Sequence, residues 1–273
     1  MIGHLINTDV GNRGVTELYI EYRRQNFNFL KKAAKTFLEN YERTLIVTGF
    51  PIPPTMRAET DGPPGAVALY NAVEKLGGKA EILTYSEIEG ALQSLGLTFV
   101  RNPPIEDYSL IIAVETPGRA ADGKYYSMSG LEIKRDTFDW IVEKARELGI
   151  PTIGIGDGGN EAGMGKIRDL VAKYIPLGER IGSVVETDEL VLSAVSNWGA
   201  YGLIGEAALA EEGLLDVLEN LDEGEILGLL WKNGIIDGVS KKTEPSVDGI
   251  KIEVHKGIVE LISKIIKQKI KSF

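Results

Sequence analysis

The chain of 273 residues contains no cysteine and only two histidines, His4 and His255. Without a thiol it cannot form a disulfide, a cysteine nucleophile, or a thiolate-ligated zinc or iron–sulfur site. The two histidines lie near the chain ends, and a Ser-His-Asp triad or a histidine-rich metal site would have to use one of them. Acid–base chemistry therefore falls mainly to carboxylates, lysine, tyrosine or arginine.

Basic residues are in deficit as well. The sequence has 30 Lys plus Arg against 40 Asp plus Glu, a formal charge of −10 and a pI near 4.9. A protein that binds nucleic acid needs a basic face to neutralise the phosphates. We therefore expect no nucleic-acid partner.

Long apolar runs and a signal peptide are also missing. No stretch approaches the roughly 18 apolar residues of a membrane span, and the N-terminal ten residues lack the charged start and apolar middle of a signal peptide. The sequence predicts a cytoplasmic protein with no membrane partner. The Lys- and Ile-rich segment from residue 254 is expected to form an amphipathic helix that packs on the domain. Association into a homo-oligomer is left open.

Short apolar runs alternate with longer segments of helical period, which predicts strand–helix–strand units around a parallel sheet. We expect strands at 44–48, 80–84, 109–114, 150–155, 181–185 and 190–195. We expect helices at 16–41, 64–76, 86–95, 137–148 and 161–174, after 197 and from 254. The predicted fold is a largely parallel or mixed sheet with helices on both faces, a three-layer α/β/α architecture. Residues 1–273 are expected to form a single domain, with 233–249 as a long functional loop.

Glycine is abundant, with 32 residues gathered mainly in four clusters. Each cluster follows a predicted strand or precedes a predicted helix, and each carries carboxylates. In a doubly wound sheet most of them should meet at the carboxyl edge, where ligands bind. The clusters are DVGNRG at 9–14, ETDGPPGA at 59–66, ETPGRAADGKYYSMSG at 115–130 and GIGDGGNEAGMGK at 154–166.

The cluster ETDGPPGA opens a predicted helix. Asp61 or Gly62 would cap that helix, and a proline suits its first turn. Capping explains Asp61 but leaves Glu59 unexplained. Two carboxylates two residues apart on an extended loop also suit metal or substrate ligands, and both interpretations stay open.

The cluster GIGDGGNEAGMGK contains G-x-G-x-x-G after a strand, but Asp157 lies inside the loop and would repel a pyrophosphate. We therefore expect no nicotinamide or flavin cofactor. A phosphate-binding P-loop is excluded because Ile167 follows the Gly-Lys pair. Asp157 and Glu161 remain as metal ligands and Asn160 as a substrate contact. The structural alternative is a helix capped by Asn160 beside Glu161.

The cluster ETPGRAADGKYYSMSG is too long for a simple connection, which is typical of a lid or binding loop. Arg119 suits a substrate carboxylate or phosphate, because its planar fork accepts two oxygens; a solvated Arg–Asp pair is the alternative. Glu115 and Asp122 are candidate proton carriers, and Tyr125 is a candidate substrate contact. Arg13 in DVGNRG is a further candidate, with a turn at a helix entry as the alternative.

Together these motifs, with TGF at 48–50 and SNWGAYG at 196–202, resemble the D-glutamate cyclase family. The matching segments run in the same order over nearly the whole chain. The resemblance implies an α/β domain, and it implies an enzyme that converts D-glutamate to 5-oxo-D-proline plus water. Eukaryotic members of the family are mitochondrial.

Cyclisation of glutamate requires a neutral amine and a γ-carboxylate whose charge is cancelled. Arg119, or a divalent Mn²⁺ or Mg²⁺ held by Glu59, Asp61, Asp157 and Glu161, could cancel it. In this hypothesis the substrate is a small anion, Arg119 orients its α-carboxylate, and Glu115 or Asp122 carries the proton. A second hypothesis is a metal-dependent phosphohydrolase that uses the same site. A third is a non-catalytic domain that binds a metabolite.

Overall fold

The computed structural model of the chain describes residues 1–271 and contains a central sheet of five parallel strands. Apolar side chains are buried on both faces of the sheet, which explains why its strands are nearly continuous apolar runs. Its strands, in spatial order, are β4 (Lys79–Leu83), β1 (Arg43–Thr48), β5 (Leu110–Val114), β6 (Thr152–Gly156) and β7 (Glu189–Leu192).

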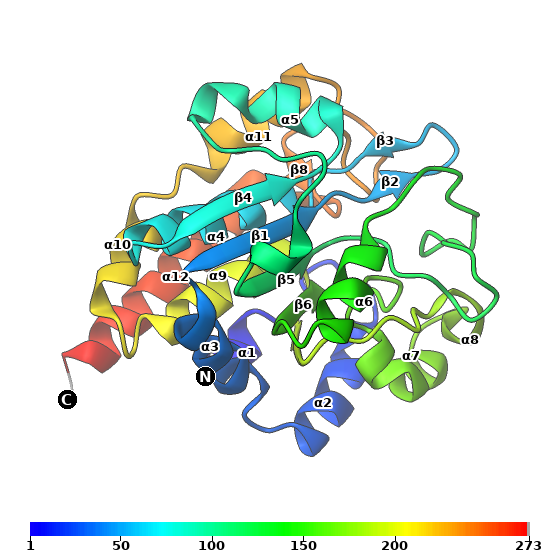
Figure 1. Cartoon of the computed structure of the whole chain (residues 1–273). Helices are drawn as coiled ribbons and strands as arrows, with labels where there is room; N and C mark the ends of the chain where they lie inside the picture. Colours follow the sequence, from blue (N-terminus) through cyan, green and yellow to red (C-terminus); the bar gives the residue numbers. More distant parts are fainter. Residues whose placement is uncertain (272–273) are drawn as a thin grey trace.

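Helices cover both faces of this sheet, and two small hairpins lie outside it (Figure 1). The hairpins pair β2 (Pro51–Ile52) with β3 (Arg57–Ala58) and β8 (Ser246–Val247) with β9 (Ile250–Lys251). The α-helices are α1 (Ile2–Leu5), α2 (Val15–Gln25), α3 (Phe29–Asn40), α4 (Pro63–Lys75), α5 (Ser86–Leu92), α6 (Asp139–Glu147), α7 (Arg168–Tyr174), α8 (Gly178–Ile181), α9 (Ser196–Ala207), α10 (Leu215–Glu219), α11 (Glu223–Lys232) and α12 (Ile252–Ile270).

Alternate residues of each strand point into different layers, as the pleat of a strand requires. Ile46 and Ile112 belong to the large core that includes α4 and α9, and α12 packs against α9 behind them. Leu45 and Ile111 instead pack with Ile141 of α6 on the opposite face. The expected three-layer α/β/α architecture is therefore confirmed, and it is consistent with one domain.

Three expected elements differ from the structure. The expected helix at 16–41 is two helices, α2 and α3, because the chain turns at Asn26. The expected helix at 161–174 begins as α-helix only at Arg168, since Glu161 and Gly163 form bridges with other segments and Gly163 has a φ of +106°. The expected strand at 181–185 is absent from the described sheets, because α8 runs into it and Ser183 makes only an isolated bridge.

The order of the strands creates a crevice at one edge of the sheet. β1 lies between β4 and β5, so the chain moves outward from β1 to β4 and then crosses back to β5. Ligands of open α/β sheets bind outside the carboxyl ends of the strands at such a reversal. The segments that follow β1, β5 and β6 therefore meet where a ligand is expected.

The long C-terminal helix α12 packs against α9, α10 and α1, as its amphipathic pattern predicts. Its Ile262 and Ile266 are fully buried in the core. No helix within residues 1–271 combines the length and the apolar character needed to cross a bilayer.

Candidate active site

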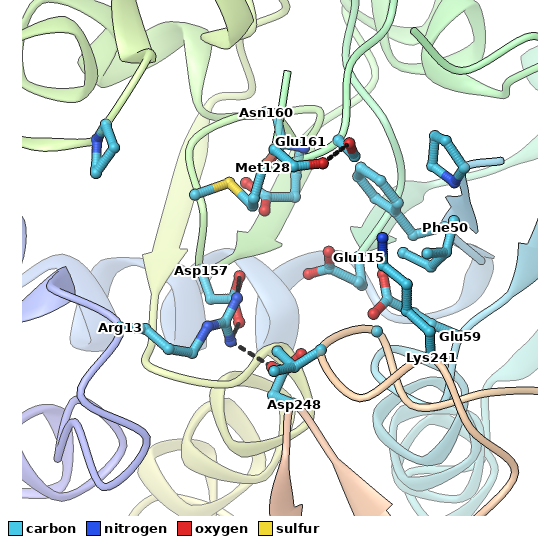
Figure 2. Close-up of a pocket in the computed structure, with 17 residues that line it drawn as sticks. Arg13, Phe50, Glu59, Glu115, Met128, Asp157, Asn160, Glu161, Lys241 and Asp248 are labelled. Atoms are coloured by element: carbon cyan, nitrogen blue, oxygen red, sulfur yellow. Dashed lines mark hydrogen bonds and ion pairs between the residues drawn. The ribbon is translucent and has the colours of Figure 1, made fainter. Parts of the chain in front are cut away.

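A cavity of about 380 Å³ lies at the carboxyl edge of the sheet (Figure 2). Phe50 follows β1, Glu115 follows β5 and Asp157 follows β6, so three neighbouring strands deliver residues to it. Loops distant in sequence complete the wall. The lining consists of Arg13, Phe50, Ile52, Pro53, Glu59, Glu115, Ser127, Met128, Ser129, Asp157, Asn160, Glu161, Pro176, Gly238, Val239, Lys241 and Asp248.

The guanidinium of Arg13 is held between two buried carboxylates. Its Nη1 lies 2.6 Å from Asp157 Oδ2 and its Nη2 lies 3.3 Å from Asp157 Oδ1, while Nη1 also donates to Asp248. The Asp9 carboxylate accepts hydrogen bonds from the backbone N–H groups of Arg13 and Gly14 at 2.8 and 2.9 Å, and thereby fixes the backbone that carries Arg13. Burial alone would lower the pKa of Arg13, but Asp157 and Asp248 raise it well above its usual value. Arg13 is therefore a permanent cation in the site.

Asp61 and Asn197 join two helix N-termini beside the carboxylates of the cavity. The Asp61 carboxylate accepts the backbone N–H groups of Ser196 and Asn197, both at 2.8 Å, at the start of α9. The Asn197 side-chain oxygen accepts the N–H groups of Gly62 and Gly65, at 3.0 and 2.9 Å, at the start of α4. Asp61 therefore does cap a helix: it satisfies two N–H groups of α9, and it also accepts the Gly62 N–H at 2.9 Å just before α4, the helix that it precedes.

Two further carboxylates are oriented by short local contacts. Glu115 has a φ of +45°, an uncommon conformation for this residue type, and its Oε2 accepts a hydrogen bond from the Ser196 hydroxyl. Glu161 accepts the backbone N–H groups of Gly158 and Gly159, each at 2.8 Å. The glycine-rich loop after β6 therefore wraps around the Glu161 carboxylate instead of a phosphate.

Two residues on the lining present side-chain oxygens that have no hydrogen-bond partner within residues 1–271. Glu59 is 5% exposed, and nothing within residues 1–271 donates to its carboxylate. Asn160 donates to the Tyr126 carbonyl at 2.7 Å, whereas its Oδ1 has no partner in the described chain. The backbone of Gly238 lies against Glu59, since a Cβ there would be 1.8 Å from Oε2. Unsatisfied buried polar groups are costly, so they point to a ligand.

Five carboxyl groups line the cavity and a sixth, that of Asp61, lies beside Asp157 and Asp248; burial raises the pKa of every one. Neighbouring carboxylates raise the pKa of Glu59, Asp61 and Glu115 further. The guanidinium of Arg13 opposes the rise at Asp157 and Asp248 but cannot balance six acids. The site therefore requires bound protons or bound cations. The six groups are Glu59, Asp61, Glu115, Asp157, Glu161 and Asp248.

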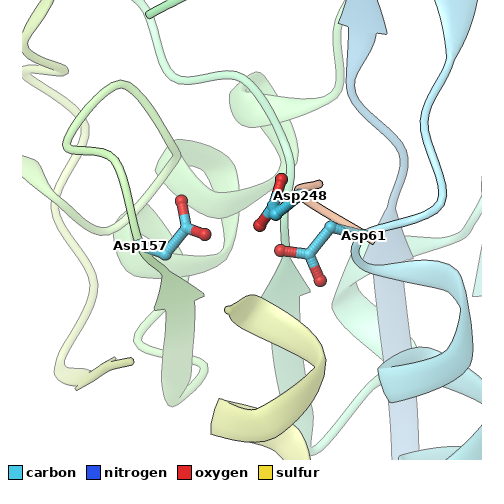
Figure 3. A group of neighbouring side chains, drawn as sticks. All are labelled: Asp61, Asp157 and Asp248. Carbon is cyan, nitrogen blue, oxygen red and sulfur yellow. The ribbon is translucent and has the colours of Figure 1, made fainter. Parts of the chain in front are cut away.

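The carboxylates define two places where a cation could sit, and Asp157 belongs to both. In one, oxygens of Asp61, Asp157 and Asp248 lie within 4.8 Å of one another (Figure 3). In the other, oxygens of Glu115, Asp157 and Glu161 meet the same limit. All of these donors are hard oxygen atoms, which suit Mg²⁺ or Mn²⁺. The residues present thus fit a divalent cation.

Most residues proposed from the sequence lie together. Three of the four proposed metal ligands fall in the two carboxylate groups described above, and the fourth, Glu59, lines the same cavity without belonging to either group. Arg13 and Asn160 also line the cavity, although Arg13 is occupied by carboxylates. The four proposed metal ligands are Glu59, Asp61, Asp157 and Glu161.

Three other proposed residues lie outside the cavity lining, because the side chains in the first part of the loop, 117–126, contact α6 or one another, and only its end, 127–129, reaches the cavity. Arg119 donates to Glu143 of α6 at 2.7 and 2.9 Å. Tyr125 donates to Asp139 of α6 at 2.8 Å. Asp122 accepts a hydrogen bond from the Tyr126 hydroxyl. A surface ion pair and two structural hydrogen bonds thus occupy these side chains.

Sequence reasoning missed Asp248 and Lys241, both of which line the cavity. Asp248 and Gly249 form the two-residue turn between β8 and β9, with φ values of +55° and +74°. Asp237 fixes this turn by accepting from Ser246 Oγ at 2.6 Å and from the Gly249 N–H at 2.7 Å. An Asp-Gly pair between apolar residues is a strong hairpin signal that could have been found.

Neither histidine lines the cavity, but His255 supports the hairpin that carries Asp248. Trp198 Nε1 donates to His255 Nδ1 at 2.9 Å, so the ring proton is on Nε2. That group faces the carbonyls of Val247 and Ile250 at 3.3 and 3.2 Å. Burial lowers the pKa of His255 and keeps the ring neutral. The role of His255 in this arrangement is to hold the turn in place.

An α/β sheet whose glycine-rich loops enclose an acidic cavity at the strand ends places the chain in a defined class. It belongs to the D-glutamate cyclase-like family, because the family model for the C-terminal part of these proteins matches residues 2–263. The chain is also 31% identical over 323 aligned positions to "D-glutamate cyclase, mitochondrial" of Homo sapiens. That alignment covers 96% of this chain and 50% of the relative, so the chain spans about half the length of the curated relative it matches.

Proposed function

We propose that this chain is a lyase that cyclises D-glutamate to 5-oxo-D-proline and water. One observation carries the proposal: the acidic cavity is built largely from the glycine-rich clusters of the sequence, all of which lie within the residues 2–263 that the D-glutamate cyclase-like family model matches. Glu59, Glu115 and Asp157, on three separate segments of those motifs, all reach the cavity. The substrate we infer is a small anion that also carries an ammonium group.

The reaction forms a bond from the α-nitrogen to the γ-carboxyl carbon and breaks one carbon–oxygen bond, so that water leaves. The α-ammonium must lose one proton before the attack and a second one after it, and the departing oxygen must gain these two protons to leave as water. Neighbouring carboxyl groups with raised pKa values serve both steps, since one can accept a proton while another still holds one. Binding both reacting ends of one molecule in a single cavity lowers the barrier further through orientation.

Glu115 is the group we assign to proton transfer. It lines the cavity, the Ser196 hydroxyl fixes one of its oxygens, and burial together with Glu161 and Asp157 raises its pKa. A proton taken from the amine can therefore be retained and returned to the departing oxygen. Asp122, the other candidate from the sequence, accepts from Tyr126 away from the cavity.

A divalent cation is the second part of the proposal. The six buried carboxyl groups exceed the charge of Arg13, and Glu59 lacks a hydrogen-bond donor among the described residues. Such an ion, when bound, would polarise the γ-carboxylate and cancel its charge. Asp61, Asp157 and Asp248, or Glu115, Asp157 and Glu161, would hold it.

Phosphate ester hydrolysis, the alternative weighed from the sequence, is not favoured. A phosphate dianion would enter a cavity lined by five carboxyl groups, where Arg13 is already paired and Lys241 is the other cationic side chain on the lining. The negative charges of the phosphate and of the carboxylates would repel each other strongly in a partly buried site. The cavity better suits a ligand that presents an ammonium group to the acids.

The test incubates purified protein with Mn²⁺ or Mg²⁺ and either D-glutamate or a phosphomonoester. We expect 5-oxoproline from D-glutamate and no inorganic phosphate from the ester. Glu115→Gln should abolish turnover, while Asp122→Asn, a matched change outside the cavity, should keep it. Phosphate release would establish the alternative hypothesis, and tight D-glutamate binding without a product would favour a non-catalytic domain.

The location and assembly of the chain stay predictions. The cytoplasmic location expected from the sequence is a prediction that fractionation would test, since the human relative is named as mitochondrial. Homo-oligomer formation is likewise open to a measurement of the mass in solution.

A further inference from the structure

We propose that Lys241 anchors the α-carboxylate of the substrate and thereby selects substrates that carry this carboxylate in addition to the γ-carboxyl group that reacts. The inference rests on the proposed function and assigns a specificity-determining residue to the same cavity. It begins from a charge asymmetry in the lining: Lys241 is the cationic side chain that is not already held between carboxylates.

The loop at 237–242 places Lys241 at the cavity. The Asp237 carbonyl accepts the Lys241 N–H at 2.8 Å, and the Asp237 N–H donates to the Lys242 carbonyl at 2.9 Å. The Asp237 carboxylate also accepts the N–H groups of Val239 and Ser240 at 2.8 and 2.7 Å. A closed and internally bonded turn therefore positions the lysine.

The backbone of this loop has a strained conformation and packs against the cavity. Lys241 has a φ of +59°, a conformation that costs free energy for a residue with a side chain. Gly238 of the same loop packs directly against the Glu59 carboxylate. Figure 2 shows the Lys241 side chain beside Glu59, extending into the cavity.

The Lys241 ammonium is free to meet a ligand. Within residues 1–271, no carboxylate pairs with it, whereas Arg13 is bound by Asp157 and Asp248. An incoming carboxylate would therefore gain a charge-assisted hydrogen bond from Lys241 without breaking an existing ion pair.

This arrangement orients the substrate. Its ammonium group is attracted by the acidic part of the cavity around Glu115 and Asp157, and its α-carboxylate is attracted by Lys241. The γ-carboxyl group is then left among the carboxylates that can supply a proton or hold a cation. Because the α-carboxylate does not react, its contact with Lys241 should be equally strong in the ground state and the transition state.

The experiment compares Lys241→Met, Lys241→Arg and Lys242→Met. Lys242 is exposed in the same loop but absent from the lining, so it is the matched control. We expect Lys241→Met to raise KM for D-glutamate by roughly ten- to a hundredfold at nearly constant kcat. Lys241→Arg should recover most of the loss, and Lys242→Met should match the wild type.

Calorimetry with D-glutamate and with 4-aminobutanoate, which lacks the α-carboxylate, measures the contribution of the α-carboxylate to binding independently of turnover. Lys241→Met should weaken binding of D-glutamate and leave binding of 4-aminobutanoate unchanged. If Lys241→Met and Lys242→Met have the same KM and the same affinity for D-glutamate, Lys241 does not anchor the substrate, and the proposed cyclase activity is unaffected by that result. A wild type that binds D-glutamate without cyclising it would contradict the proposed function, and the same affinities would still decide the role of Lys241.

Discussion

Asp61 and Asn197 cap each other's helices: the Asp61 carboxylate accepts from the first residues of α9, and the Asn197 side chain accepts from the start of α4. Both residues are almost completely buried. The exchange satisfies N–H groups that a helix leaves without partners, and it fixes the two helix starts relative to each other. Asp61 is thereby held beside Asp157 and Asp248.

Replacement of Asn197 by alanine should therefore destabilise the protein. It leaves the Gly65 N–H buried without an acceptor, while the Gly62 N–H keeps only its bond to Asp61, and we expect a loss of about 1–3 kcal/mol in the free energy of unfolding. Urea unfolding measures it. Asn220→Ala, at an exposed helix end, is the control and should cost far less. Equal losses in the two variants would show that the exchange of caps contributes nothing.

Arg13 and Arg119 should behave oppositely when each is replaced by methionine. Arg13→Met leaves Asp157 and Asp248 without their counter-charge, so we expect turnover of D-glutamate to fall by roughly two orders of magnitude. Arg119→Met removes a half-exposed pair with Glu143, so stability should change by less than about 1 kcal/mol and turnover should remain. Steady-state kinetics and thermal unfolding test both, and the reverse pattern would contradict the assignment of the cavity.

The candidate site could be predicted only in part from the sequence. Asp157 and Glu161 follow directly from a buried strand and a glycine-rich loop, so local pattern alone placed them at the strand ends. Arg119 lies on an equally promising loop, but its long side chain reaches Glu143 of α6. Spacing along the chain does not specify which way such a side chain turns.

Asp248 could not be placed from the sequence for a different reason. Its Asp-Gly turn predicts a hairpin, but the position of that hairpin depends on contacts far along the chain. His255, itself bonded to Trp198, faces the carbonyls on both sides of the turn. Likewise, the helical period from residue 161 could not reveal that Glu161 bridges to Pro117 instead of starting a helix.

Glu223 should make stability depend on pH. Its Oε1 accepts from Tyr201 at 2.9 Å, Oε2 has no partner in the described chain, and burial raises its pKa from 4.5 to about 7. Between these pH values the folded state binds a proton that the unfolded state has lost, so this stabilisation is complete below 4.5 and is lost as the pH rises through about 7.

Glu223→Gln keeps the acceptor for Tyr201 and removes the titration. We expect the free energy of unfolding of the variant, relative to the wild type, to increase by on the order of 2–3 kcal/mol between about pH 4.5 and about pH 8. At about pH 8 the variant should be the more stable of the two. Urea unfolding at the two pH values gives both differences. A difference that does not change with pH would show that Glu223 ionises without cost in the folded protein.

The most direct test of the acidic cavity is a titration of Mn²⁺ into metal-stripped protein with D-glutamate present, in which bound metal and 5-oxo-D-proline are measured together. We predict that product formation rises in proportion to the bound metal. Asp157→Asn, which alters the residue common to both candidate cation positions, should neither bind the ion tightly nor form product. Full turnover in the chelator-treated wild type, or in Asp157→Asn, would contradict the proposal that these carboxylates hold a catalytic cation.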